Sequence, residues 1–156
     1  MFQDEGVGIM SSDLDDFVQD LQEQIFEEAR AAYGDVVFER WLNPIYMGTI
    51  DNPDGYACLT GSCGDTMQIF LRFENGRVKD ASFQTDGCGS SAVCGSFAAE
   101  IAIGKNPDEL MEITGDAILG KLGGLPEEEK HCAFLAEESL QEALNDYMIK
   151  QRQKSK

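Results

Sequence analysis

The sequence is poor in basic residues, with 12 lysines and arginines against 29 aspartates and glutamates and a formal net charge of −17. Four of the bases lie in the last seven residues, so residues 1–149 hold all 29 acids and only eight bases. A field of this sign repels phosphate backbones, which argues against nucleic acid as a partner. It favours cations and basic protein surfaces instead.

Long apolar runs are also missing. No stretch approaches the about 18 apolar residues of a membrane-spanning helix, so we expect no membrane partner. Residues 1–5 are acidic where a signal peptide is basic, which predicts a cytoplasmic protein. Thiols stay reduced in that compartment, and an odd number of cysteines cannot all pair. We therefore interpret the five cysteines as metal, redox or packing residues.

The 156 residues, 42% of them hydrophobic, have the size and composition of one globular domain. A chain of this length buries enough surface to fold without a disulfide or a metal. We predict a loose N-terminus over residues 1–11, a single domain over 12–150 and a basic polar tail over 151–156.

A helical pattern opens the predicted domain over residues 12–32. Its apolar positions are Leu14, Phe17, Val18, Leu21, Ile25 and Ala29. They recur at the spacing of one helical face, and acids fill the other positions. We interpret this segment as an acidic amphipathic helix that packs on the domain. A short second helix is expected near 36–42, ending before Pro44.

The middle of the chain has the pattern of strands. Residues 67–73 alternate between apolar and other side chains, and Asn75-Gly76 then predicts a tight hairpin turn. Return and third strands are expected over 78–84 and 56–60. Helices follow, over about 89–104, 108–113 and 116–122, and Pro126 is expected to open a long last helix. This order predicts an α+β fold, a three-stranded antiparallel sheet with helices packed on one face.

Three cysteines lie beside turns or helix starts. Cys63 lies in a glycine-flanked turn, Cys88 just ahead of a predicted helix, and Cys132 beside the only histidine in the first turns of the last helix. A helix start lowers a thiol pKa, and the thiolate binds metal. Cys94, in an apolar helix, and Cys58, in a strand without a glycine neighbour, are interpreted as packing residues.

The spacings between these three cysteines are 25 and 44 residues. Zinc fingers and ferredoxins use short-range cysteine pairs instead, so the fold must bring these thiols together. Such a site suits a protein that opens and releases what it holds. A cysteine-protease pair of His131 and Cys132 is disfavoured, because adjacent helix residues do not face one another.

Three sequence segments, GSCGD at 61–65, TDGCGS at 85–90 and HCAFLAE at 131–137, resemble the IscU family. This family includes the N-terminal domain of NifU and consists of scaffold proteins on which iron–sulfur clusters are built. The resemblance covers about residues 33–148. It implies a scaffold and not an enzyme, with the three-stranded sheet and one-sided helices that the pattern also predicts.

The resemblance also implies the chemistry of the site. Cys63, Cys88 and Cys132 would be the cluster-binding thiolates, Asp65 a carboxylate linked to cluster lability, and His131 a further candidate ligand. A cysteine desulfurase would deliver persulfide sulfur and a separate donor the iron. A [2Fe–2S] cluster would form transiently and pass to apo iron–sulfur proteins.

Residues 125–130 depart from the family. They read LPEEEK where the bacterial chaperone-docking segment reads Leu-Pro-Pro-Val-Lys, which argues against recognition by the dedicated Hsp70-type chaperone.

Two other functions remain open at this point. One is a SufU-like sulfurtransferase that binds zinc and accepts persulfide; the short second spacing and His131 argue against it. The other is a structural zinc domain, for which three Cys with Asp or His would suffice.

Overall fold

Three strands form one antiparallel sheet in the computed structural model, which describes the backbone of residues 2–155 and the side chains of residues 13–154. The strands are β1 (Gly55–Thr60), β2 (Thr66–Glu74) and β3 (Arg77–Thr85), in the order β1-β2-β3. Asn75 and Gly76 both have positive φ, 56° and 77°, as a tight hairpin turn requires. The predicted sheet and its hairpin are confirmed.

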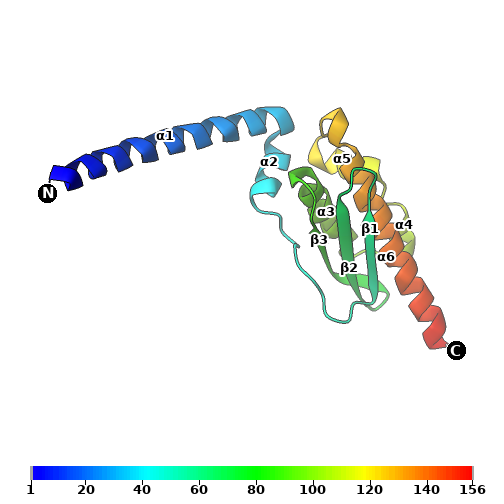
Figure 1. The fold of residues 1–156 in the computed structure, drawn as a ribbon. Coiled ribbons are helices and arrows are strands. Elements are labelled where there is room, and N and C mark those ends of the chain that lie inside the picture. Colours follow the sequence, from blue (N-terminus) through cyan, green and yellow to red (C-terminus); the bar gives the residue numbers. More distant parts are fainter. Residues whose placement is uncertain (1, 156) are drawn as a thin grey trace.

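Helices cover one face of this sheet (Figure 1). They are α3 (Gly89–Ala102), α4 (Pro107–Met111), α5 (Gly115–Leu122) and α6 (His131–Ser155). The inward side chains of β2, Met67, Ile69 and Leu71, are fully buried against them. Each such side chain contributes about 1.5–3 kcal/mol by leaving water. The α+β prediction, with helices on one face, is confirmed.

The start of the last helix differs from the prediction. Pro126 has an extended backbone, with ψ 148°, and leads into the 3₁₀ turn η1 (Glu127–Glu129). Helix α6 begins only at His131, which places His131 and Cys132 in its first turn. The helix continues through residues 151–155, where a polar tail was predicted.

The outer edge of β3 is covered by the segment that leads from α2 (Asp35–Leu42) to β1. Met47 pairs with Phe83 as an isolated parallel bridge, and the Gly48 amide donates to the Phe83 carbonyl at 2.9 Å. Arg40 ties α2 to α3, because its guanidinium donates to Ser96 and Glu100. Both backbone groups of Phe83 are thereby paired, since its amide also donates to the Tyr46 carbonyl at 3.0 Å, and this part of the edge is not open to another chain.

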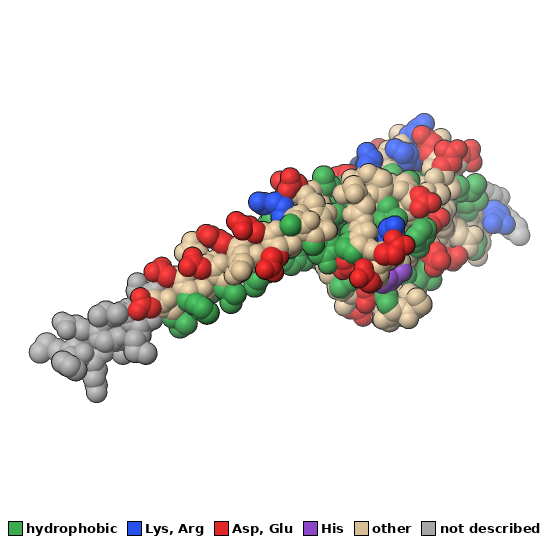
Figure 2. All heavy atoms as spheres, turned by 90° about the horizontal axis from the view of Figure 1, so that it is seen from above, with side chains coloured by type: hydrophobic (Ala, Val, Ile, Leu, Met, Phe, Trp, Pro, Cys, Tyr) green, Lys and Arg blue, Asp and Glu red, His purple; other side chains and the backbone are tan. Residues whose placement is uncertain are grey.

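Helix α1 (Phe2–Tyr33) extends away from the sheet as a long arm (Figure 1). From residue 13 on, apolar side chains follow one side of it and acids the other (Figure 2). The apolar residues Leu14, Phe17, Val18, Leu21 and Ile25 are 46–63% exposed. The prediction that this helix packs on the domain is therefore wrong for most of its length.

Among the side chains of α1 that the structure describes, those of the last turns reach the rest of the protein. The ring of Phe26 lies 5.6 Å from that of Phe38 and 6.4 Å from that of Trp41, both on α2. Over the predicted loose residues 1–11, the backbone is helical from Phe2, and the side chains lie outside the described residues. The proposed domain limits of 12–150 stay a prediction. None of the described helices is both long and apolar enough to cross a membrane.

Candidate metal centre

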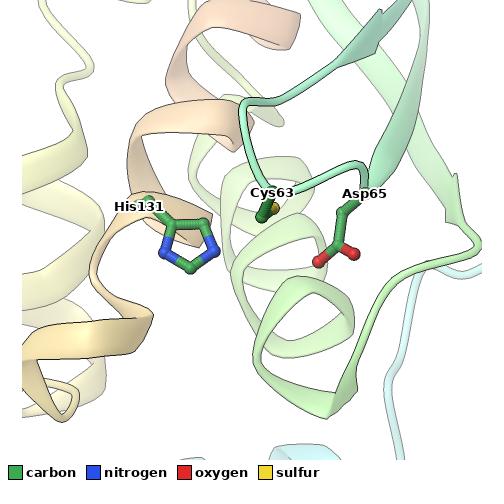
Figure 3. Close-up of side chains that lie close together, drawn as sticks. All are labelled: Cys63, Asp65 and His131. Carbon is green, nitrogen blue, oxygen red and sulfur yellow. The ribbon is translucent and has the colours of Figure 1, made fainter.

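Three parts of the chain meet at one end of the sheet: the β1–β2 turn, the start of α3 and the start of α6. Two groups of donor atoms form there, Cys63 with Asp65 and His131, and Asp65 with Cys88 and Cys132. Within each group the donor atoms lie within 4.8 Å of one another. Figure 3 shows Cys63 and Asp65 from the turn and His131 from α6 around one space. The five residues singled out in the sequence thus come together, and Asp65 belongs to both groups.

The β1–β2 turn presents Cys63 to solvent. The Gly61 amide donates to the Asp65 carbonyl at 2.8 Å, and the Gly64 amide donates to the Gly61 carbonyl at 3.0 Å. Gly64 has φ +92°, a conformation that favours glycine. This compact turn leaves Cys63 exposed at its tip and half-buries Asp65.

Cys88 occupies the position just before the first residue of α3. Its Sγ lies 3.8 Å from Oδ2 of Asp65. A Cβ on the preceding Gly87 would lie 2.6 Å from the same Oδ2 and 2.9 Å from Oγ of Ser91. Glycine at position 87 therefore makes room for Asp65 beside Cys88.

Cys132 is fully buried, unlike Cys63 and Cys88. Burial raises the pKa of the Cys132 thiol to about 12, although a hydrogen bond from Ser91 acts in the opposite direction. The sequence-based expectation of a lowered pKa at this helix start is wrong for Cys132, since loss of hydration outweighs the helix dipole.

His131 does approach its neighbour, because its Nε2 lies 3.7 Å from Sγ of Cys132. The prediction that these adjacent side chains do not face one another is therefore wrong. A protease role is still disfavoured, since the buried Cys132 offers no surface to a peptide substrate.

The two remaining cysteines, Cys94 and Cys58, differ in burial. Cys94 is fully buried in α3, and burial raises the pKa of its thiol, so its interpretation as a packing residue is confirmed. Cys58 is exposed, and the same interpretation is wrong for it. Its neighbours Ala57 and Leu59 turn toward the helices, so strand alternation places Cys58 on the outer face.

Ser91 is the site residue that the sequence reading missed. Its Oγ lies 2.8 Å from Oδ2 of Asp65, 3.3 Å from Sγ of Cys132 and 3.9 Å from Sγ of Cys88. The spacing could have indicated it, because Ser91 follows Cys88 by three residues and so lies on the same side of the helix.

A mostly apolar cavity of about 250 Å³ adjoins the site where α1, α2 and α3 meet. Cys88, Tyr33, Trp41 and Glu129 are among its lining residues. The Tyr33 hydroxyl donates to Glu129 at 3.0 Å, which raises the pKa of Tyr33. The end of α1 therefore helps to form the surroundings of Cys88.

The donor set has a definite chemical preference. Three thiols with one imidazole and one carboxylate suit iron–sulfur clusters and zinc, whereas magnesium and calcium prefer oxygen ligands. The residues present thus fit the cluster that the sequence motifs imply.

Comparison with known proteins agrees with these observations. The family described as NifU-like N terminal domain matches residues 32–154. The chain is 40% identical over 119 residues to the iron-sulfur cluster assembly scaffold protein IscU 1 of Archaeoglobus fulgidus, covering 76% of this chain and 78% of that protein. It is 34% identical over 122 residues to the scaffold protein IscU of Aquifex aeolicus, with the same coverages.

Two solved structures share the fold. The N-terminal part of a NifU-like protein from Brucella abortus superimposes with a TM-score of 0.64 at 17% identity, covering 78% of this chain and 97% of that one. A putative scaffold protein for the SUF system from Fervidobacterium islandicum gives 0.58 at 19% identity, with coverages of 74% and 98%.

Proposed function

The chain belongs to the family of NifU-like N-terminal domains, and on that premise we propose that it is a scaffold for iron–sulfur cluster assembly. A cluster is built on it from iron and persulfide sulfur and then passes to apo-proteins. The observation that carries this proposal is the meeting of three thiols, from three separate chain segments, around one shared carboxylate.

The cluster is the cargo of this protein, and Cys63, Cys88 and Cys132 are its proposed thiolate ligands. Two donor groups that share Asp65 match the need of a [2Fe–2S] cluster for donors on both irons. Asp65 and His131 supply the donors that are not thiolates. A carboxylate is a harder donor than a thiolate and favours exchange at an iron, which a carrier requires.

The proposed partners are a cysteine desulfurase, a separate source of iron and apo iron–sulfur proteins. Cys63 and Cys88 are exposed, so another protein can reach both thiols. This exposure supports delivery of sulfur and iron by separate partner proteins. The three acids of η1 precede His131 where the family carries its chaperone-docking residues, so an Hsp70-type chaperone is not among the proposed partners. The reaction needs reduced thiols, which the cytoplasm maintains.

Anaerobic reconstitution tests the proposal. The purified protein receives ferrous iron, cysteine and a cysteine desulfurase, and visible absorption follows the cluster. We expect a chromophore on the wild type and none that persists on Cys63→Ser, Cys88→Ser or Cys132→Ser. Cys94→Ala and Cys58→Ala are the matched controls and should keep it. A wild type without a chromophore, or loss of the cluster in folded Cys94→Ala, would contradict the proposal.

A second candidate is a zinc-dependent sulfurtransferase of the SufU type. The group of Asp65, Cys88 and Cys132 favours it, because one carboxylate and thiolates suit tetrahedral zinc. In that case the zinc-loaded protein, given desulfurase and cysteine but no iron, would acquire a persulfide that mass spectrometry detects. Iron would then yield no chromophore, so the two candidates are distinguishable.

A further inference from the structure

Ser91 lies where the two donor groups meet, and it is fully buried. Its Oγ lies 2.8 Å from Oδ2 of Asp65 and 3.3 Å from Sγ of Cys132. Asp65 comes from the β1–β2 turn and Cys132 from α6, so Ser91 on α3 links all three parts of the site.

A hydroxyl has a single hydrogen and can donate it to only one of these two acceptors at a time. The Asp65 carboxylate, at 2.8 Å, is the nearer acceptor, and the sulfur of Cys132, at 3.3 Å, is the second one within reach.

We propose that Ser91 is a positioning residue: its buried hydroxyl holds the Asp65 carboxylate beside Cys88 and lies within hydrogen-bond distance of the sulfur of Cys132. It thereby keeps donors from two separate elements at the spacing that metal binding needs. That the bound metal belongs to an iron–sulfur cluster rests on the proposed function; the anchoring of Asp65 does not.

The packing around Ser91 explains why a small hydroxyl residue is needed. Ser91 is fully buried, and a Cβ on the neighbouring Gly87 would already lie 2.9 Å from its Oγ. Alanine at position 91 is no larger than serine, so Ser91→Ala removes the hydroxyl without adding bulk.

Ser96 provides the matched control on the same helix. It is also fully buried, accepts a hydrogen bond from Arg40 and donates to the Ile45 carbonyl at 2.6 Å. It has no contact with the thiols among the interactions that the structure describes. Ser96→Ala thus removes a buried, hydrogen-bonded hydroxyl outside the site.

The first measurement uses the full-length, reduced, metal-free protein and Co²⁺ alone as the probe. Thiolate-to-cobalt charge-transfer absorption reports binding. Loss of a residue that orients ligands weakens metal binding by about 10- to 100-fold, and we expect this for Ser91→Ala. We expect Ser96→Ala to bind cobalt like the wild type.

The second measurement is the reduction potential of the reconstituted cluster. Hydrogen bonds to cluster sulfur raise the potential, so Ser91→Ala should lower it while Ser96→Ala leaves it unchanged. Wild-type cobalt affinity in folded Ser91→Ala, or an equal loss in Ser96→Ala, would overturn the proposal. If no cluster forms on the wild type, the proposed function fails, but the cobalt measurement still decides the role of Ser91.

Discussion

Helices α1 and α6 have 32 and 25 residues, and each carries apolar residues at helical spacing, but among the described side chains α6 buries these residues and most of α1 does not. Leu135, Leu140 and Leu144 of α6 are at most 4% exposed, whereas five apolar residues between positions 14 and 25 of α1 are 46–63% exposed. An apolar face stabilises a fold only through the surface that covers it. The two helices therefore contribute very differently to the same domain.

Two physical features separate the helices. Small residues let α6 approach the sheet closely. A Cβ at position 55 of β1 would clash with the Ala143 carbonyl of α6, so this approach requires Gly55. Helix α1 instead carries seven acids between residues 13 and 28, and Arg30 is the only base between residues 13 and 33. The rest of the protein is acidic as well, so repulsion opposes folding α1 back onto it.

The largest expected effect is that of a leucine truncation in α6. Leu140 is fully buried, so Leu140→Ala should lower the free energy of unfolding by about 2–5 kcal/mol. Leu21→Ala on α1, where the leucine is 46% exposed, should change it by less than about 0.5 kcal/mol. Urea unfolding followed by circular dichroism and by Trp41 fluorescence measures both. Equal losses would mean that α1 also packs on the domain.

Phe26 marks the point where α1 begins to matter for stability. Its ring packs edge-on against Phe38 and Trp41, and such pairs contribute about 0.5–1.5 kcal/mol beyond burial. Phe26→Ala should thus lower the free energy of unfolding by about 1–2 kcal/mol and alter Trp41 fluorescence. The control is Phe17→Ala, nine residues earlier and 63% exposed, which should do neither.

The same contrast shows how far local patterns reach. Alternation over 67–73 and the Asn75-Gly76 turn predicted the hairpin, because both depend on neighbouring residues alone. The periodicity of residues 14–29 predicted the α1 helix but not its packing, since it shows which residues share a face and nothing about the opposing surface. The α6 start at His131 was missed because Pro126 can precede either a helix or an extended turn.

At the metal centre, too, local motifs predicted some features, and others depend on tertiary packing. The three motifs around Cys63, Cys88 and Cys132 pointed to residues that the fold does bring together. The burial of Cys132 depends on α3 and α6 packing, so its raised pKa could not be read from position at a helix start. Ser91 was missed because a lone serine forms no motif, although its spacing from Cys88 was available. Alternation in β1 could have placed Cys58 correctly.

A smaller effect is expected at the metal centre, where a substitution of Asp65 in the β1–β2 turn should change the lifetime of the cluster. Asp65→Ala removes the carboxylate that both donor groups share, and the remaining donors are mainly thiolates. We expect the reconstituted cluster to decay several-fold more slowly than on the wild type, because a carboxylate favours exchange at iron. Decay of the visible absorption under identical anaerobic conditions measures this. If Asp65 only stabilises the turn after Cys63, its loss will speed the decay, which is the opposite sign.

The smallest effect is expected from α1 charge on association with a cysteine desulfurase. If the desulfurase presents a basic surface, acids on α1 raise the association rate through long-range attraction. Changing Asp13, Asp16 and Asp20 to Asn should then slow association a few-fold at low salt and leave the dissociation rate unchanged. The difference should vanish as salt rises, because the Debye length falls from about 10 Å at 0.1 M to about 3 Å at 1 M. Stopped-flow or surface-based kinetics across a salt series measure it, with Leu21→Ala as the uncharged control. A rate indifferent to salt for both chains would show that the acidic arm has no part in steering.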